Sequence, residues 1–336
     1  MENQIRKYIN HAIRGSYNNI MPKSIILKIC ILVMYTITLF SCETVIDTTL
    51  PDRDKKIVLN SLINPEGLFW VNLSKSTGIL DSGPMNFIDN GKVKIYQSGN
   101  FIEELIITSN GNYYSLNHYP VSDKTYEILV DVSDMPSVSA ECFIPPPIEI
   151  ISSDTVSYID NWGDKVIEGK IIFNDPVEES NYYWFTTTYT QINIQIDSIG
   201  NVITDNLGNP VLEKSEGTFW VDLSYRTGGI EDVSHYMKGI FFSDRIIDGK
   251  NFKLEFNLYP FWSGDYSIIW LNMYFELRSV TKDFYLYARS LGGHFDNGPF
   301  SEPSQVYNNI KNGFGIFAGY STSRDSVLLI DQIGNL

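Results

Sequence analysis

The chain has 336 residues, of which 14% are aromatic and 19% charged, and its formal net charge is −15 at pH 7. Such an acidic protein repels nucleic-acid phosphates and anionic lipid surfaces, which argues against binding of DNA or RNA and against membrane attachment through a basic patch. The aromatic content favours β-sheet, where aromatic and β-branched side chains pack on pleated surfaces.

The N-terminal region ends in a short motif centred on Cys42. An apolar segment, residues 25–40, leads into Leu39-Phe40-Ser41-Cys42, and the chain then turns polar and acidic. This pattern resembles a bacterial lipobox, in which a signal peptidase cuts before the cysteine and the cysteine is acylated. The alternatives are a transmembrane anchor and a cleaved secretory signal. A spanning helix needs about 20 mostly apolar residues, whereas this segment is shorter and contains Lys28.

Residues 1–41 are therefore predicted to be a lipoprotein signal peptide, with translation starting at Met21, where Met-Pro-Lys-Ser opens a complete short signal. Residues 42–56 lack periodicity and are predicted to be a tether. Residues 42–336 carry 20 Lys and Arg against 39 Asp and Glu. Once Cys42 is acylated, Cys142 is the one cysteine left and is expected to be a small buried hydrophobe.

Residues 57–145 contain about seven short strand patterns separated by polar turns, which is typical of a β-sandwich. Val93 and Ile95 alternate with polar neighbours, and Asn110-Gly111 is a strong hairpin signal. The predicted strands are 56–60, 68–73, 92–96, 101–108, 113–116, 125–132 and 137–144.

Pro145-Pro146-Pro147 is the predicted domain boundary, because three prolines cannot join a sheet ladder. An edge strand continuing into the next domain is the alternative. Residues 146–336 are predicted to form a second β-sandwich. Its predicted strands are 169–174, 181–189, 191–199, 239–244, 251–258 and 266–277.

One segment of the second block has helical periodicity. Phe284, Tyr287, Ala288 and Leu291 follow the i, i+3, i+4, i+7 spacing, which predicts a short helix over about 281–291. Ser279 or Thr281 can cap its N-terminus, and Gly292 can stand at its end. The predicted fold is mainly β: two β-sandwich domains in tandem, Ig-like or transthyretin-like, with one short helix near the C-terminus.

Several stretches together resemble a known family. They are Cys42–Asp47, Ile57–Ile63, Pro145–Ile148, Phe241–Asp244 with Asp248–Lys250, Glu276–Val280 leading into Asp283–Tyr285, and the closing run Pro299–Pro303, Val306–Ile310 and Gly313–Ser321. With these stretches the chain resembles the Bacteroidota outer-membrane lipoproteins of domain-of-unknown-function family 4249. The resemblance covers nearly all of 42–336. It implies an outer-membrane lipoprotein, often encoded beside a TonB-dependent transporter, and it implies no reaction and no catalytic residues.

Motifs for catalysis are absent from the sequence. His118, His235 and His294 lie in different segments, and no His-Glu-x-x-His or Gly-x-Ser-x-Gly occurs. We therefore predict no enzyme activity and no metal or cofactor site. Acidic turns leave a structural calcium as an alternative, although no twelve-residue calcium loop is present. The acidic residues in question are Asp154, Asp160, Asp164, Asp175, Asp205 and Asp296.

The candidate binding residues are the aromatic ones in the segment 259–266. Tyr259, Phe261, Trp262 and Tyr266 surround a Gly-Asp turn, where they can stack on a sugar or anchor a partner. The alternative is that they pack under the loop as core.

The expected function is an accessory lipoprotein of the outer membrane, anchored by the acyl chains of Cys42 on its periplasmic or cell-surface face. It would capture a ligand for a TonB-dependent transporter or act as a partner subunit of one. The alternatives are a surface adhesin or structural module and, less favoured, a hydrolase with an unrecognised site.

Overall fold

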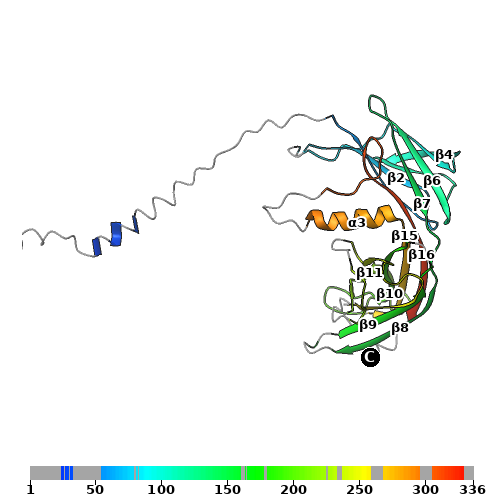
Figure 1. Ribbon diagram of the computed structural model, residues 1–336. Coiled ribbons are helices and arrows are strands. Elements are labelled where there is room, and N and C mark those ends of the chain that lie inside the picture. Colours follow the sequence, from blue (N-terminus) through cyan, green and yellow to red (C-terminus); the bar gives the residue numbers. More distant parts are fainter. Residues whose placement is uncertain are drawn as a thin grey trace, which may run out of the picture. The chain divides into compact units, whose positions relative to one another are not determined.

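Figure 1 presents a computed structural model of the chain, in which residues 1–52 and 53–336 are two compact units. The structure describes residues 24–25, 27–29, 31–32, 54–78, 81, 83–159, 163, 165–177, 180–224, 226–232, 237–258, 268–295 and 305–328; at 165, 193, 268–271 and 292–295 only the backbone is described. Within these ranges no helix has the length and apolar character needed to cross a membrane.

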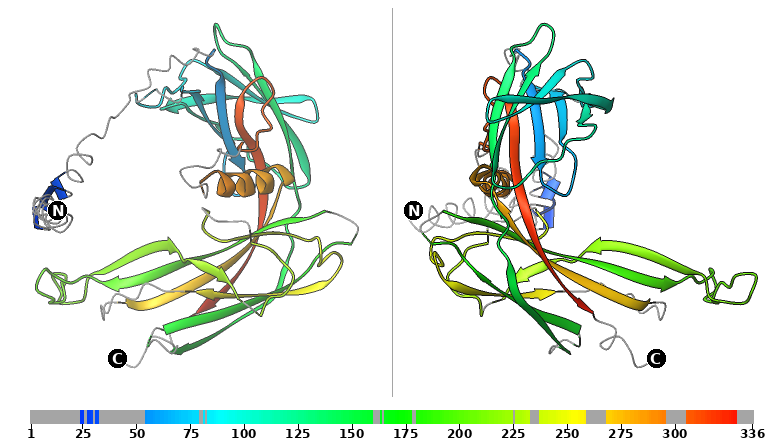
Figure 2. Two further views of the ribbon diagram at one scale, coloured as in Figure 1. Left: turned by 60° about the vertical axis from the view of Figure 1, so that its left-hand side comes forward. Right: turned by 90° about the vertical axis from the view of Figure 1, so that its right-hand side faces the viewer.

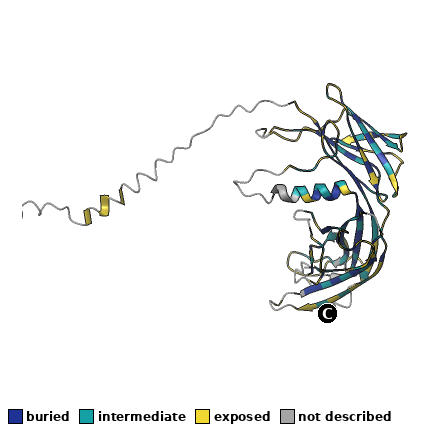
Figure 3. Ribbon diagram, in the orientation of Figure 1, coloured by how far each residue is buried: buried dark blue, intermediate teal, exposed yellow. Residues whose placement is uncertain are grey.

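The first block has seven strands, as the hydrophobic alternation predicts. Inward-facing residues such as Leu59, Val93, Ile95 and Ile128 are buried, and Cys142 lies in the same core. Figure 3 shows buried residues alternating with more accessible ones, mostly of intermediate exposure, along these strands, as expected for a sheet with one buried face. The strands are β1 (Ile57–Ile63), β2 (Trp70–Lys75), β3 (Lys92–Gln97), β4 (Asn100–Ser109), β5 (Asn112–Tyr114), β6 (Lys124–Asp131) and β7 (Val138–Ile144).

The second block follows the predicted Pro-rich connection, because β7 ends at Ile144 and the next strand begins at Ile150. Its elements are β8 (Ile150–Ile159), β9 (Lys165–Asn174), β10 (Tyr182–Ile194), β11 (Leu212–Thr218), β12 (Val221–Leu223), β13 (Ile240–Ser243), β14 (Asn251–Leu258), β15 (Ile268–Val280), α3 (Lys282–Phe295) and β16 (Phe314–Leu328). The predictions of a mainly β fold and of a short helix near the C-terminus are confirmed.

The strands form two sheets. A twelve-stranded sheet has the order β11-β10-β15-β16-β1-β2-β5-β4-β3-β6-β7, with β13 pairing β10, and a four-stranded sheet has the order β12-β14-β9-β8. In the second block the two sheets pack face to face. The ring centroids of Phe185 on β10 and Phe256 on β14 lie 4.4 Å apart across this core.

Strand β16 belongs to both blocks. Its first residues pair in parallel with β1, and its later residues pair antiparallel with β15. Phe317 lies in the first core, together with Ile310 just before the strand. Figure 2 shows β16, in red, as one long strand running between the two sets of strands. The division into tandem domains stays a prediction, and the shared strand means that the C-terminus completes the sheet of the first block.

The helix α3 covers part of the face of the large sheet that lies opposite the four-stranded sheet. Phe284 and Ala288 pack there against Phe241, Ile316 and Ala318. As predicted, Thr281 caps it: the Phe284 N–H donates to the Thr281 hydroxyl at 3.2 Å. The predicted end is wrong, because the helix continues through Gly292 to Phe295. Glycine weakens a helix interior without necessarily ending it.

Candidate functional site

Beyond α3, polar side chains cover part of the same face of the large sheet. Strand β15 explains why: Met273, Phe275 and Leu277 point into the core between the sheets, so Tyr274 and Glu276 point to the opposite face. The side chains that line this area, here called the polar face, bound a hollow of about 600 Å³. They are Thr188, Thr190, Lys214, Glu216, Thr218, Tyr274, Glu276 and Arg324, with Tyr189 and Gly217 also at its edge.

Glu276 is the buried centre of the polar face. It is only 3% exposed, and it lies directly opposite Arg324 of β16 in the sheet. Its Oε1 atom accepts from Arg324 Nε at 3.0 Å and from the Thr188 hydroxyl at 3.3 Å. Arg278 Nη2 donates to the Oε2 atom at 2.5 Å. The carboxylate therefore fixes two arginines from two adjacent strands.

Arg278 contacts two aromatic rings as well as the carboxylate of Glu276. Its guanidinium carbon lies 4.0 Å from the centre of the Trp184 ring and 5.1 Å from the centre of the Tyr320 ring. Both distances are within the range of a cation–π contact. The Arg278 Nε atom is buried with no acceptor among the described residues. This arginine thus joins the polar face to the aromatic cluster under α3.

The electrostatics of the site keep Glu276 ionised. Burial alone would raise its pKa, but attraction to Arg278 and Arg324 outweighs burial, and the pKa of Glu276 lies below its ordinary value. Burial would lower the pKa of Arg324, yet Glu276 and Glu66 raise it. Arg324 Nη2 also lies 3.3 Å from the exposed carboxylate of Glu66. Two cations and two anions therefore balance at the site.

This arrangement suits binding better than proton transfer. A carboxylate held ionised between two arginines is a poor general acid or base at neutral pH. The hydroxyl groups of Thr188 and Thr190 can both donate and accept hydrogen bonds. The exposed ion pair of Lys214 and Glu216, with 2.7 Å between Nζ and Oε1, adds a charged donor and a charged acceptor. Within the described ranges, no group of three or more His, Cys, Asp or Glu side chains is placed to hold a metal ion.

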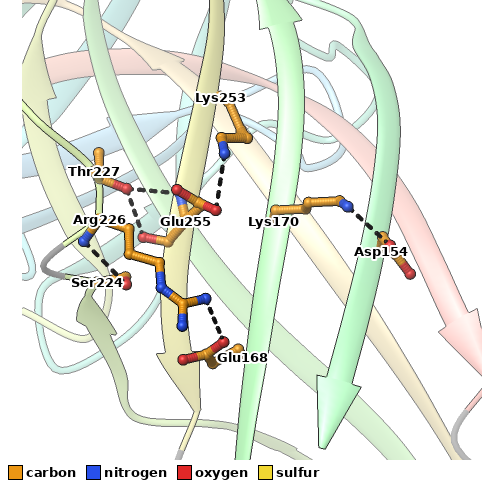
Figure 4. A network of polar contacts seen from close by, with 8 residues as sticks. All are labelled: Asp154, Glu168, Lys170, Ser224, Arg226, Thr227, Lys253 and Glu255. Atoms are coloured by element: carbon orange, nitrogen blue, oxygen red, sulfur yellow. Dashed lines mark hydrogen bonds and ion pairs between the residues drawn. The ribbon is translucent and has the colours of Figure 1, made fainter.

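A second polar network lies on the outer face of the four-stranded sheet (Figure 4). Its charges pair among themselves: Lys170 with Asp154 at 3.0 Å, Arg226 with Glu168 at 2.9 Å, and Lys253 with Glu255 at 3.0 Å. The hollow beside it measures only about 130 Å³. Exposed pairs of this kind contribute little to stability, and this hollow is much smaller than the one at the polar face. The polar face is the better candidate.

The buried acids Asp175 and Asp244 have structural roles. Asp175 accepts from the Tyr183 hydroxyl and from the Gly249 N–H, and Asp244 accepts from the Asn181 N–H. Burial raises the pKa of both carboxyl groups, although these hydrogen bonds oppose the shift. Each aspartate thus ties the turn before β14 to the start of β10.

The residues predicted as sites from the sequence lie mostly elsewhere. Cys42 and the aromatic residues Tyr259, Phe261, Trp262 and Tyr266 lie outside the described residues, as do Asp160, Asp164 and Asp296. Asp154 pairs with Lys170, and Asp205 accepts N–H groups of its own turn, so the structure does not bring these two together with Asp175. His118 pairs with Glu103 at 2.8 Å on the surface.

Sequence reasoning did not single out the polar face. A signal for it is present in β15, where Glu276 and Arg278 occupy alternate positions within a mostly apolar and aromatic strand. Charges inside such a strand indicate either a solvated face or a buried ion pair. Arg324 carried no signal of its own, because its partner lies 48 residues away.

None of the curated proteins compared with the chain matches it. The family model described as "Domain of unknown function (DUF4249)" matches residues 43–326, which includes both cores and the polar face. The chain therefore belongs to the DUF4249 family of proteins.

Proposed function

We propose that this protein is a non-catalytic ligand-binding lipoprotein of the outer membrane that serves a TonB-dependent transporter as an accessory subunit. The observation that carries the binding role is the open polar face, where buried Glu276 holds Arg324 in place beside partly buried hydroxyl groups. A rigid set of donors and acceptors binds a ligand without losing side-chain freedom.

The anchoring part of the proposal comes from the sequence. Cys42 follows an apolar segment in a lipobox-like motif, and the family match begins at residue 43, directly after it. A signal cut before Cys42 would leave the matched region as the mature protein. The acyl chains would then supply the membrane attachment that the acidic surface of the protein does not.

The ligand class follows from the lining of the polar face. Positive and negative groups balance there, so a strongly charged ligand gains little. Hydroxyl groups, two tyrosines and the outer edge of Arg324 suit a neutral ligand rich in hydroxyl or amide groups. Oligosaccharides and short peptides share that chemistry.

Binding can be tested directly on oligosaccharide and peptide arrays, followed by calorimetry on the ligands that bind. Tyr274→Ala and Lys214→Ala remove side chains from the polar face and should each weaken binding about tenfold, the effect of losing one good polar contact. Lys253→Ala, on the outer face of the four-stranded sheet, is the matched control and should bind like the wild type. Equal binding by all three variants would place the ligand elsewhere.

The accessory role calls for crosslinking and affinity purification from outer membranes, with wild type and Cys42→Ala compared. Recovery of a TonB-dependent transporter with the wild type, and its loss with the variant, is the expected result. A wild-type protein that sits in the membrane and brings down no transporter would favour a surface adhesin instead.

A further inference from the structure

The outer face of the first block carries exposed apolar side chains where β1 begins. The register places Phe314, Val58, Ser74 and Phe87 in one row across β16, β1, β2 and the segment after it. Neighbours in such a row point to the same face, and Ile57, Leu59, Leu73 and Ile88 point into the core instead. Phe314 is 44% exposed and Phe87 40%, and Met85 beside it is 60% exposed. We call Val58, Met85, Phe87 and Phe314 the β1-end patch.

A lysine lies beside the β1-end patch. Lys56 Nζ stands 5.0 Å from the centre of the Phe314 ring. The segments 54–57, 74–89 and 311–314 contain four lysines and three aspartates, whereas residues 42–336 have about half as many basic as acidic residues. One of these aspartates, Asp81, is paired with Lys55 at 3.5 Å. Asp134 lies on the next loop along this end. Basic and acidic residues are therefore nearly balanced around the patch, whereas acidic residues are in excess over residues 42–336 as a whole.

The chain that leads to Cys42 leaves the fold at this patch. Eleven residues lie between Cys42 and Asp54, and the tether predicted from the sequence for this stretch can span at most about 40 Å. Tethering at that distance gives an effective concentration in the millimolar range, so that a weak surface contact is populated. Aromatic and lysine side chains together suit the boundary between lipid headgroups and acyl chains.

We infer that the β1-end patch rests on the headgroup region of the bilayer that holds the acyl chains of Cys42, an inference that rests on the lipid anchoring in the proposed function. Phe87, Phe314 and Met85 contact the acyl boundary, and Lys56 reaches lipid phosphates. Arg324 lies ten positions after Phe314 on β16, so the polar face is held about 30 Å further along the strand, away from the lipid.

The test uses the full-length protein, processed and acylated in bacteria and reconstituted into vesicles of phosphatidylethanolamine and phosphatidylglycerol. Met85→Cys carries an environment-sensitive fluorophore, and Leu207→Cys, at an 87% exposed position in the β10–β11 connection, carries the same label as a control. Cys142 is buried and does not compete for the label. Spin-labelled lipids should quench the label at position 85 several-fold more strongly than the label at position 207.

Flotation, read together with the quenching, separates the possible failures. Flotation with the vesicles reports anchoring by itself: a protein that does not float contradicts the proposed function. A protein that floats but shows equal quenching at positions 85 and 207 overturns the membrane contact alone.

Exposed aromatic residues provide the matched pair of variants. Phe314→Ser in the labelled protein should reduce quenching at position 85, whereas Phe101→Ser, which removes a 57% exposed phenylalanine at the opposite end of β3 and β4, should leave it unchanged. Since both positions are exposed, unfolding curves that match the wild type establish that each variant is folded. Unchanged quenching in folded Phe314→Ser would contradict the assigned role of this patch.

Discussion

Glu276 on β15 and Arg324 on β16 face each other directly in the sheet, and both Nε and Nη2 of the arginine lie within 3.0 Å of Oε1 of the carboxylate. Because the same carboxylate also accepts from Arg278, a single buried acid connects two strands and two guanidinium groups. The polar face depends on this arrangement for its shape and its charge balance.

Glu276→Gln should therefore destabilise the fold. The variant leaves Arg278 and Arg324 without their shared carboxylate, and breaking a buried ion pair on one side costs about 3 kcal/mol. Urea unfolding followed by circular dichroism measures the change. Glu255→Gln is the control, because Glu255 pairs with the half-exposed Lys253 and its loss should cost less than about 1 kcal/mol. Equal losses in both variants would contradict the central role of Glu276.

Glu276 should also make the free energy of unfolding depend on pH. Since its pKa is lowered in the folded state, its contribution is fully present above the ordinary glutamate pKa of 4.5 and is lost as the pH falls through the folded value. The free-energy difference between wild type and Glu276→Gln should thus shrink as the pH drops from about 6 to about 3. A difference that stays constant over this range would show that Glu276 is not held ionised by its arginines.

The buried acids at the turn before β14 should act in the opposite direction. Burial raises the pKa of Asp175 and Asp244, so folding favours their protonated forms. Between the ordinary aspartate value of 3.8 and the raised folded values, their contribution to stability increases as the pH falls. Asp244→Asn should remove part of this dependence, which urea unfolding at several pH values between 4 and 7 can measure. Asp222→Asn, at an exposed position, should leave the dependence unchanged.

The parallel pairing of β1 and β16 should be sensitive to one glycine. Gly315 has a φ of 112°, and a Cβ atom at this position would stand 2.0 Å from the Leu59 carbonyl oxygen. Gly315→Ala should lower the free energy of unfolding by more than about 2 kcal/mol, because both the backbone conformation and the contact are incompatible with a side chain.

Gly67 offers the matched control for this substitution. A Cβ atom there meets nothing within 4 Å, and its φ is not positive, so Gly67→Ala should be close to neutral. Thermal unfolding of the two variants side by side gives the comparison. A stable Gly315→Ala protein would argue against the tight approach of β16 to β1.

The stacked guanidinium of Arg278 predicts that lysine cannot replace it. Lys keeps the charge but lacks the planar group that lies against Trp184 and Tyr320, so Arg278→Lys should lose about 1 kcal/mol of stability. Arg289→Lys on the exposed side of α3 is the control and should unfold like the wild type. Urea unfolding measures both, and equal stability of the two variants would count against the stacking.

Local pattern was sufficient for much of the fold. Alternation at Val93 and Ile95 predicts the buried face of β3, and both residues are fully buried. The spacing of Phe284 and Ala288 predicts the face of α3 that meets the sheet, and the lone Cys142 is a buried thiol, as expected. Each of these predictions concerns which way a side chain points, and the periods of strand and helix determine that from neighbouring residues.

Tertiary structure alone decided which strands are neighbours. Alternation in β15 puts Glu276 and Arg278 on one face but cannot say that Arg324 lies beside them, and the Arg324–Glu66 contact joins residues 258 positions apart. The same holds for β16, which closes the sheet of the first block although it lies at the far end of the chain. Side-chain period is a local property of the backbone, whereas strand order depends on which distant surfaces bury each other best. Local pattern therefore predicts buried faces such as those of β3 and α3, whereas β8, β11 and β12 lie where no strand is predicted, and the polar face depends on long-range packing.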